Sequence, residues 1–350
     1  MRQFAAALIA AALLIARLND LLQRGFLPGY DALAYLAGAH AVARGASPIG
    51  MTERFGSLLS PIYIYPPPLA VFLVPLAALS FPVNLLLWDG LVLGSTILLA
   101  VLLARDLGVL RGALAVLLCW PVWESLHLGQ VNALVACLVA LAMQDRRARG
   151  AWLALGALVK LTPGLGLIVL ATRGAWRQVM LGAAVGFAVF GATLSIVGVR
   201  AWIDGVTFAA RMPLDVPWVR SPVGLIELRA GPLVAVALAL TIVAVTAWAG
   251  RGVDPERALA AAILATLLAA RATWPMHMVL ALPALAVLWR SRRDVALLVW
   301  LCLSIDGVLL VPIGIGIAWM ACLWPPLAHM PAQRRAWLTP PSRRPSRRSA

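Results

Sequence analysis

A series of thirteen apolar runs fills most of the chain and constrains its fold more than any other feature. Because 62% of the residues are hydrophobic and only 12% are charged, a water-soluble domain cannot bury so much apolar surface. In lipid the backbone must satisfy its own hydrogen bonds, so the spans are predicted to be helices of an all-α polytopic membrane protein. The runs cover residues 4–22, 68–82, 84–104, 112–126, 131–143, 150–161, 163–172, 178–198, 226–249, 257–271, 277–289, 295–311 and 313–327.

The arginines between these runs predict the orientation of the chain. A straight span needs about 20 apolar residues, and the run 68–82 is short, contains Pro75 and follows Pro66 and Pro67. We therefore treat it as a re-entrant or interfacial helix. With Met1 in the cytoplasm, 19 of the 29 basic residues then lie on the cytoplasmic side, as the positive-inside rule expects. This orientation predicts a bundle of about twelve spans in the bacterial cytoplasmic membrane.

The domain organisation follows from the same pattern. We predict one membrane domain over residues 1–330 and a basic, disordered cytoplasmic tail over 331–350, which is rich in Pro, Arg and Ser. The run 4–22 has no clean signal-peptidase site and is predicted to be retained as the first span. The net charge of +15 reflects topology, so the expected partners are membrane lipids and not nucleic acid. The four cysteines lie in apolar runs without metal-binding spacing, and no metal site is expected.

A loop over residues 23–83 follows the first run and is the first place to look for function. A loop of this length in a chain built for lipid is usually functional. It contains Asp31, Tyr35 and Tyr65. Asp31 can act as general base on a hydroxyl nucleophile. The alternative is an N-cap, because Asp31 precedes the helix-like stretch 32–44, and the two roles are compatible.

A polar cluster separates two apolar runs in the sequence Glu124-Ser125-Leu126-His127-Leu128-Gly129-Gln130-Val131-Asn132. Polar residues at membrane depth are costly and usually functional, so His127, Gln130 and Asn132 are candidate substrate-binding residues. The alternative is that Gln130 and Asn132 cap the next helix through bonds to the backbone. The predicted orientation places the cluster on the same outer face as Asp31.

Basic residues at two further turns complete the candidate site. Lys160 stands alone in an apolar run just before Pro163. It either binds the phosphate of a lipid-linked substrate or extends to the membrane interface. Arg271 and His277 flank a Trp-Pro turn, where His277 is suited to bind phosphate or sugar hydroxyls. Trp274 is either a sugar platform or an interfacial aromatic residue.

Two carboxylates within apolar runs, Asp89 and Asp306, support a second hypothesis. In a secondary transporter or lipid-sugar flippase they would form a pathway with Lys160. A transporter places its site near the bilayer midplane and often shows inverted repeats. In this chain the polar residues gather at one predicted face and no repeat is convincing, so an enzyme is the favoured interpretation.

The order of four short motifs resembles glycosyltransferase family 87, a family of GT-C membrane glycosyltransferases. The motifs are Asp31 with Tyr35 and Gly45, Tyr65-Pro66-Pro67, Gly129-Gln130-Val131-Asn132 and Lys160-Leu161-Thr162-Pro163. The resemblance implies an inverting mannosyltransferase with a GT-C-like helix bundle. Its donor would be a polyprenyl-phosphate-linked sugar and its acceptor a glycolipid or polysaccharide outside the cytoplasmic membrane.

The resemblance also implies roles for individual residues. By analogy with the family, Asp31 is the general base that deprotonates the acceptor hydroxyl. Lys160 and His277 would hold the donor phosphate and stabilise its charge as it leaves. Enzymes of this type often need no bound metal, so we expect no cofactor beyond the donor itself. The remaining candidate substrate-binding residues are Tyr35, Tyr65, His127, Gln130, Asn132 and Arg271.

Overall fold

The computed structural model describes residues 29–211, 214, 219–305 and 309–324, together with the isolated positions 12, 15 and 19. The predicted tail, Asp306 and nearly all of the predicted first span lie outside the described residues. The fold below is therefore that of the chain from Gly29 to Trp324, apart from the gaps between these ranges.

Helices make up nearly all of the regular structure in the described ranges, which confirms the all-α prediction. The strands described there are a short antiparallel pair, β1 (Arg54–Phe55) and β2 (Leu58–Leu59). The helices are α2 (Tyr30–Ala43), α3 (Pro67–Phe72), α4 (Val74–Ala77), α5 (Phe81–Leu107), α6 (Val109–Leu117), α7 (Trp120–His127), α8 (Asn132–Gln144), α9 (Arg149–Val159), α10 (Gly164–Thr172), α11 (Trp176–Arg211), α12 (Pro222–Ala230), α13 (Pro232–Ala249), η2 (Gly250–Gly252), α14 (Pro255–Ala269), η3 (Pro275–Leu280), α15 (Ala281–Trp289), α16 (Arg293–Ile305) and α17 (Leu310–Leu323).

Three described helices are long and apolar enough to cross a membrane, namely α5, most of α11, and α13 continued through η2. A fourth span results if α6 and α7 are counted together, although they are bent by 59° at the break between them. Shorter apolar helices, such as α8 and α9, are present as well. Length and composition thus support a helical membrane protein with three or four such spans, and the count of twelve stays a prediction.

Proline and glycine explain where the helices depart from the apolar runs of the sequence. The run 112–126 is divided because α7 starts anew at Trp120 with Pro121 in its first turn, where a missing N–H is tolerated. The run 226–249 is divided at Gly231, whose φ of 88° ends α12. The run 68–82 contains most of α3 and all of α4, which have only 6 and 4 residues. At 1.5 Å per residue neither is long enough to cross a bilayer, as the sequence predicts.

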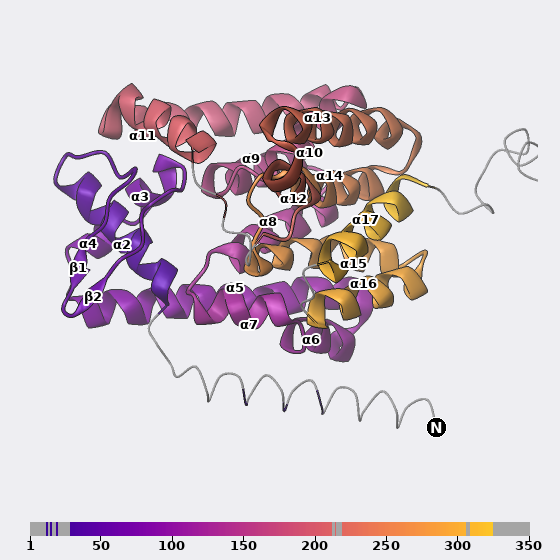
Figure 1. Ribbon diagram of the computed structural model, residues 1–350, viewed down its shortest axis with the longest axis horizontal. Helices are drawn as coiled ribbons and strands as arrows, with labels where there is room; N and C mark the ends of the chain where they lie inside the picture. Colours follow the sequence, from indigo (N-terminus) through magenta and orange to yellow (C-terminus); the bar gives the residue numbers. More distant parts are fainter. Residues whose placement is uncertain are drawn as a thin grey trace, which may run out of the picture.

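Among the described residues, three hydrophobic clusters organise these helices. The largest cluster extends from α5 to α17. It includes α14, an alanine-rich helix that is buried along most of its length. Small residues of this kind let neighbouring helices approach closely. A second cluster joins α2 and α3 to α5, and a third, smaller one joins α2 to β1. Figure 1 shows α2, α3, α4 and the strand pair at one end of the molecule, with α5 running from there along the lower part of the bundle toward α6.

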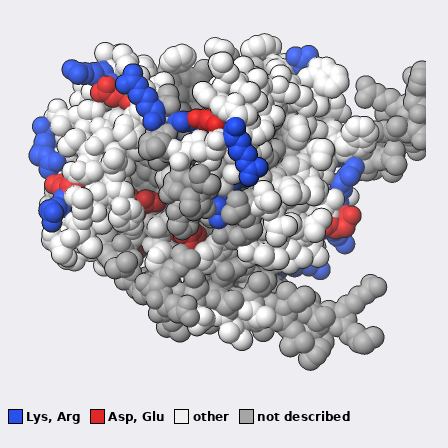
Figure 2. Space-filling model, in the orientation of Figure 1, with Lys and Arg blue, Asp and Glu red and all other residues white. Residues whose placement is uncertain are grey.

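The surface suits a lipid environment more than water. On the face that Figure 2 draws, charged side chains are sparse among the described residues, and uncharged ones cover most of their surface. The predicted spans expose large apolar side chains: Leu86 on α5 is 72% exposed, and Leu233 on α13 is 84% exposed. Exposed apolar side chains in such numbers are rare in soluble monomers and typical of proteins that contact lipid.

Candidate active site

The turn between α7 and α8 holds α2 and α5 together at the candidate site. The backbone N–H of Asp31 donates to the carbonyl of Leu128 at 2.9 Å, and the indole N–H of Trp88 donates to the carbonyl of Gly129 at 2.8 Å. Gly129 has a φ of 66°, a conformation that favours glycine. A Cβ at this position would lie 2.9 Å from the Cβ of Ala32. The first turn of α2 is therefore packed directly against this turn.

Asp31 lies inside the first turn of α2 and does not cap it. The helix begins at Tyr30, its N-cap position is Gly29, and no side chain makes a capping hydrogen bond there. The N-cap interpretation of Asp31 is therefore wrong, because the helix starts one residue before it. The carboxylate is half-buried and accepts a hydrogen bond from the amide nitrogen of Gln130.

The amide of Gln130 is fully buried and oriented by its neighbours. Its oxygen accepts a hydrogen bond from the Tyr35 hydroxyl at 2.9 Å, and its nitrogen donates to Asp31 and, at 3.0 Å, to the Tyr65 hydroxyl. Because a carboxylate can only accept, the nitrogen must face Asp31 and the oxygen must face Tyr35. The helix-cap alternative for Gln130 is wrong, since α8 has Val131 at its N-cap position without a side-chain bond.

Lys160 is directed inward and bonded to a second buried amide. Its Nζ donates to the Asn132 side-chain oxygen at 2.7 Å, and it lies 5.8 Å from the centre of the Tyr65 ring. The amide nitrogen of Asn132 donates to the carbonyl of Met276 at 2.9 Å. The interfacial position considered for Lys160 and the capping role considered for Asn132 are both wrong, because these side chains bond to each other across the bundle.

The charges of Asp31 and Lys160 act on each other. Burial raises the pKa of the Asp31 carboxyl to about 6; the Gln130 hydrogen bond and the charge of Lys160 lower it, and Glu124 raises it further. Burial lowers the pKa of Lys160 to about 7, against the opposing effect of Asp31. Both side chains therefore titrate near neutral pH, where a general base and a switchable cation are most useful.

His277 lies near Lys160 and Asn132. It lies in η3, one residue after the Met276 carbonyl that Asn132 contacts, and the charge of Lys160 acts on it. The backbone N–H of Trp274 donates to Nδ1 of His277 at 3.4 Å, and the two rings stack with centroids 5.8 Å apart. With Nδ1 accepting, the neutral imidazole carries its proton on Nε2 and can donate it to an oxygen of a ligand.

Two other predicted substrate-binding residues, His127 and Arg271, have no hydrogen bond to Asp31, Gln130, Asn132 or Lys160 among the described residues, and their role stays a prediction. His127 is half-buried at the end of α7, and its side chain makes no hydrogen bond to a described residue. Arg271 uses its Nε to bond both carboxylate oxygens of Glu227, at 2.7 and 2.8 Å. Its charge is therefore balanced by Glu227. The transporter hypothesis gains no support, because Asp89 lies on the exposed side of α5 while Lys160 is bonded inside the bundle.

Two buried aromatic residues that the sequence analysis did not assign to the site, Trp88 and Tyr63, pack against its tyrosines. Trp88 is fully buried and packs on Tyr35 with ring centroids 4.8 Å apart. Tyr63 is also fully buried, and its hydroxyl donates to the Pro66 carbonyl at 2.8 Å. A tryptophan in an apolar run looks like an interfacial residue. The spacing of Tyr63 and Tyr65 was the available signal, because alternate residues of an extended segment point to the same side.

No metal site was found among the described side chains. Within the described ranges, no group of three or more His, Cys, Asp and Glu residues is placed to hold a metal ion. The expectation that the reaction needs no cofactor stays a prediction.

Comparison with known proteins adds independent information on identity. A model of glycosyltransferase family 87 matches residues 63–283, well over half of the chain, and this range includes Gln130 and Lys160. Comparison with curated proteins and with solved structures gave no significant match. Asp31 precedes the matched range and is joined to it by the hydrogen bond from Gln130. The extent of the family match, on a helical membrane fold that gathers the polar residues of the matched motifs, shows that the chain belongs to glycosyltransferase family 87.

Proposed function

We propose that this glycosyltransferase moves a mannosyl or related glycosyl residue from a polyprenyl-phosphate-linked donor to a glycolipid or polysaccharide acceptor, with inversion. The observation that carries the proposal is that a half-buried carboxylate, Asp31, and a lysine, Lys160, lie on either side of Gln130 and Tyr65, where the charge of each acts on the other. Transfer from a sugar phosphate needs one group that takes the acceptor proton and another that balances the leaving phosphate. These two residues match those needs.

The proposed reaction is a single displacement at the anomeric carbon. The acceptor hydroxyl gives its proton to the Asp31 carboxylate as its oxygen forms the new bond to the anomeric carbon. The bond from that carbon to the phosphate oxygen breaks on the opposite side, which inverts the configuration. The electron pair leaves with the polyprenyl phosphate, whose growing charge is stabilised by Lys160 and by the Nε2 proton of His277.

The buried amides are proposed to position these groups without touching the reacting atoms. Gln130 holds Asp31 and is itself held by Tyr35, and Asn132 holds Lys160. Fixed geometry of this kind lowers the cost of bringing reactants into line. Tyr65 lies between the two amide systems, because its ring is near Lys160 and its hydroxyl is near Gln130.

The site is proposed to face the outside of the cytoplasmic membrane. Trp88 contacts the site turn near the start of α5, and Leu107 is the last residue of that helix. These residues are 19 positions apart, so they are separated by about 28 Å at 1.5 Å per residue. The basic residues Arg105, Arg111 and Arg290 gather at the far end. Because positive charge favours the cytoplasmic side, this arrangement supports an outward-facing site.

The experiment that tests the proposal measures sugar transfer from radiolabelled polyprenyl-phosphate mannose in membranes that contain each variant. Asp31→Asn removes the base but keeps the size of the side chain, so transfer should fall about 100-fold or more while donor binding is retained. Lys160→Ala removes the charge opposite the phosphate, so it should weaken donor binding.

The matched control is Asp89→Asn, which neutralises an exposed carboxylate on α5 and should leave transfer unchanged. Near wild-type transfer by Asp31→Asn would reject Asp31 as the base and direct attention to Glu124. Loss of transfer in Asp89→Asn as well would show that the assay does not distinguish the proposed site from an exposed carboxylate elsewhere on α5.

A further inference from the structure

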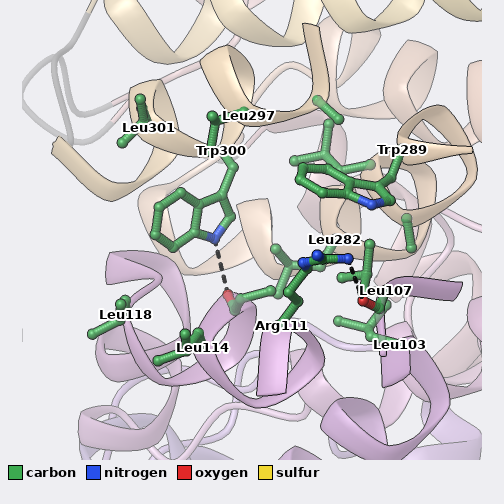
Figure 3. A pocket seen from close by; sticks show the side chains of 14 residues that line it. Leu103, Leu107, Arg111, Leu114, Leu118, Leu282, Trp289, Leu297, Trp300 and Leu301 are labelled. Carbon is green, nitrogen blue, oxygen red and sulfur yellow. Dashed lines mark hydrogen bonds between the residues drawn. The ribbon is translucent and has the colours of Figure 1, made fainter. Parts of the chain in front are cut away.

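An apolar pocket lies at the end of the bundle remote from Asp31, between α5, α6, α15 and α16 (Figure 3). Its volume is about 380 Å³, and leucine side chains with Trp289 and Trp300 form most of its wall. The indole N–H of Trp300 donates to the carbonyl of Ala115 at 3.0 Å, which fixes that ring in the wall. The volume lies within the range of about 300–1,000 Å³ that is typical of ligand pockets.

Two arginines lie beside Trp289, one of the residues that line this pocket. The guanidinium of Arg111, the one charged group among the described lining residues, lies 5.8 Å from the centre of the Trp289 ring, and that of Arg293 lies 6.0 Å from the same centre. Within the described part of the chain, no carboxylate is within ion-pair distance of either one. Their neighbour Arg290, by contrast, pairs with both Asp106 and Glu256. The side of the pocket near Trp289 therefore carries positive charge that the described carboxylates leave unpaired.

The position of the pocket separates it from the donor site. Leu103 and Leu107 of α5 line it, and they follow Trp88 by 15 and 19 residues. At 1.5 Å per residue these positions are about 22 and 28 Å from the site turn along the helix. That distance approaches the thickness of the hydrocarbon core, about 30 Å. A lipid whose phosphate lies beside Lys160 cannot place the same phosphate beside Arg111.

We propose that this pocket binds an anionic membrane phospholipid, with one acyl chain between the leucines and its phosphate on Arg111 and Arg293. The apolar wall matches the acyl chain, and the two arginines match a phosphate that carries a net negative charge. Basic pockets between transmembrane helices are known to bind anionic lipid head groups on the cytoplasmic side. The proposal is independent of the sugar that the enzyme transfers.

The test is lipid binding to the purified full-length chain, followed by native mass spectrometry. The probes are phosphatidylglycerol and phosphatidylcholine with identical acyl chains, which differ in net charge. The unaltered chain should bind phosphatidylglycerol at least tenfold more tightly. Arg111→Gln should remove this preference, and Leu297→Trp, which fills the pocket from an exposed position on α16, should weaken binding of both lipids.

The matched control is Arg105→Gln, which removes an exposed arginine from the same end of α5 that bonds Gln144 and does not line the pocket. This variant should bind phosphatidylglycerol like the unaltered chain. Equal binding of the two lipids, an unchanged preference in Arg111→Gln, or an equal loss in Arg105→Gln would each overturn the proposal. Displacement of phosphatidylglycerol by a short polyprenyl phosphate would overturn it too, by making the pocket part of the donor path. Because no turnover is measured, failure here is distinguishable from failure of the proposed transferase.

Discussion

The Gln130 amide joins Asp31 to Tyr35, because its two ends bond to different side chains. The oxygen end is occupied by the Tyr35 hydroxyl, so the nitrogen end is directed to the carboxylate. A donated hydrogen bond stabilises the ionised carboxylate and opposes the effect of burial on the Asp31 pKa. In the proposed mechanism, Gln130 is therefore a positioning residue that also sets the pH at which Asp31 becomes a base.

The variant Gln130→Glu tests this role, because it exchanges the donor for a second carboxylate of the same shape. A like charge disfavours the ionised form, so the pKa of Asp31 should rise by about one unit or more. The acidic limb of the profile of kcat/KM against pH should move upward by the same amount. Tyr35→Phe, which leaves the amide nitrogen in place, should shift it much less. An unshifted limb in Gln130→Glu would show that the amide does not tune Asp31.

The pH profile of the unaltered enzyme tests Asp31 and Lys160 together. Activity should rise with pH as Asp31 loses its proton near pH 6, and fall again as Lys160 loses its own above about pH 7. The two limbs report apparent values of an interacting pair. Lys160→Arg keeps the charge at all pH values and should remove the alkaline limb. If that limb persists in Lys160→Arg, a different group causes it.

At the scale of elements, contacts of the turn at Gly129 fix where α2 lies relative to α7 and α8. Three contacts meet there: the bond from Asp31 to Leu128, the bond from Trp88 to Gly129, and the close packing of Gly129 on Ala32. The packing is possible because Gly129 has no Cβ. The position of Asp31 therefore depends more on the close contact between α2 and the backbone of this turn than on the helix that contains Asp31.

The variant Gly129→Ala should disturb this approach. Its Cβ would lie 2.9 Å from that of Ala32, and the left-handed conformation adds a cost of about 1–2 kcal/mol. We expect a lower Tm and a loss of transfer activity. Gly50→Ala is the control, because Gly50 has a similar φ of 74° but a Cβ there would meet nothing within 4 Å. Equal losses in both variants would mean that backbone strain alone, and not the contact with α2, is responsible.

At the scale of the whole molecule, the orientation in the membrane decides which lipids and acceptors reach the site. The proposed topology puts the start of α5 outside and the turn between α8 and α9 inside. Val83 is exposed at the first position and Arg147 at the second. In a background without Cys302, which is partly exposed, Val83→Cys should react with a membrane-impermeant thiol reagent in intact cells. Arg147→Cys should react only after the membrane is opened, and the reverse pattern would overturn the topology.

The sequence by itself determined the class of the protein and most members of the candidate site. Long apolar runs with short basic connections are local properties of composition, and they suffice to predict helices in a membrane. Asp31, Gln130, Asn132 and Lys160 were evident because polar residues are rare in such a chain. The family match from residue 63 to residue 283 agrees with that interpretation.

Only the tertiary structure decided which partners these side chains form hydrogen bonds with. Asp31 and Gln130 are 99 residues apart, and Asn132 and Met276 are 144 apart, so no local rule connects them. For Asp31, Gln130 and Asn132 the sequence left a local alternative open, a helix cap, and for each the structure shows a distant partner instead. The physical reason is that a buried polar group must find a partner, and the packing of distant helices determines which one is within reach.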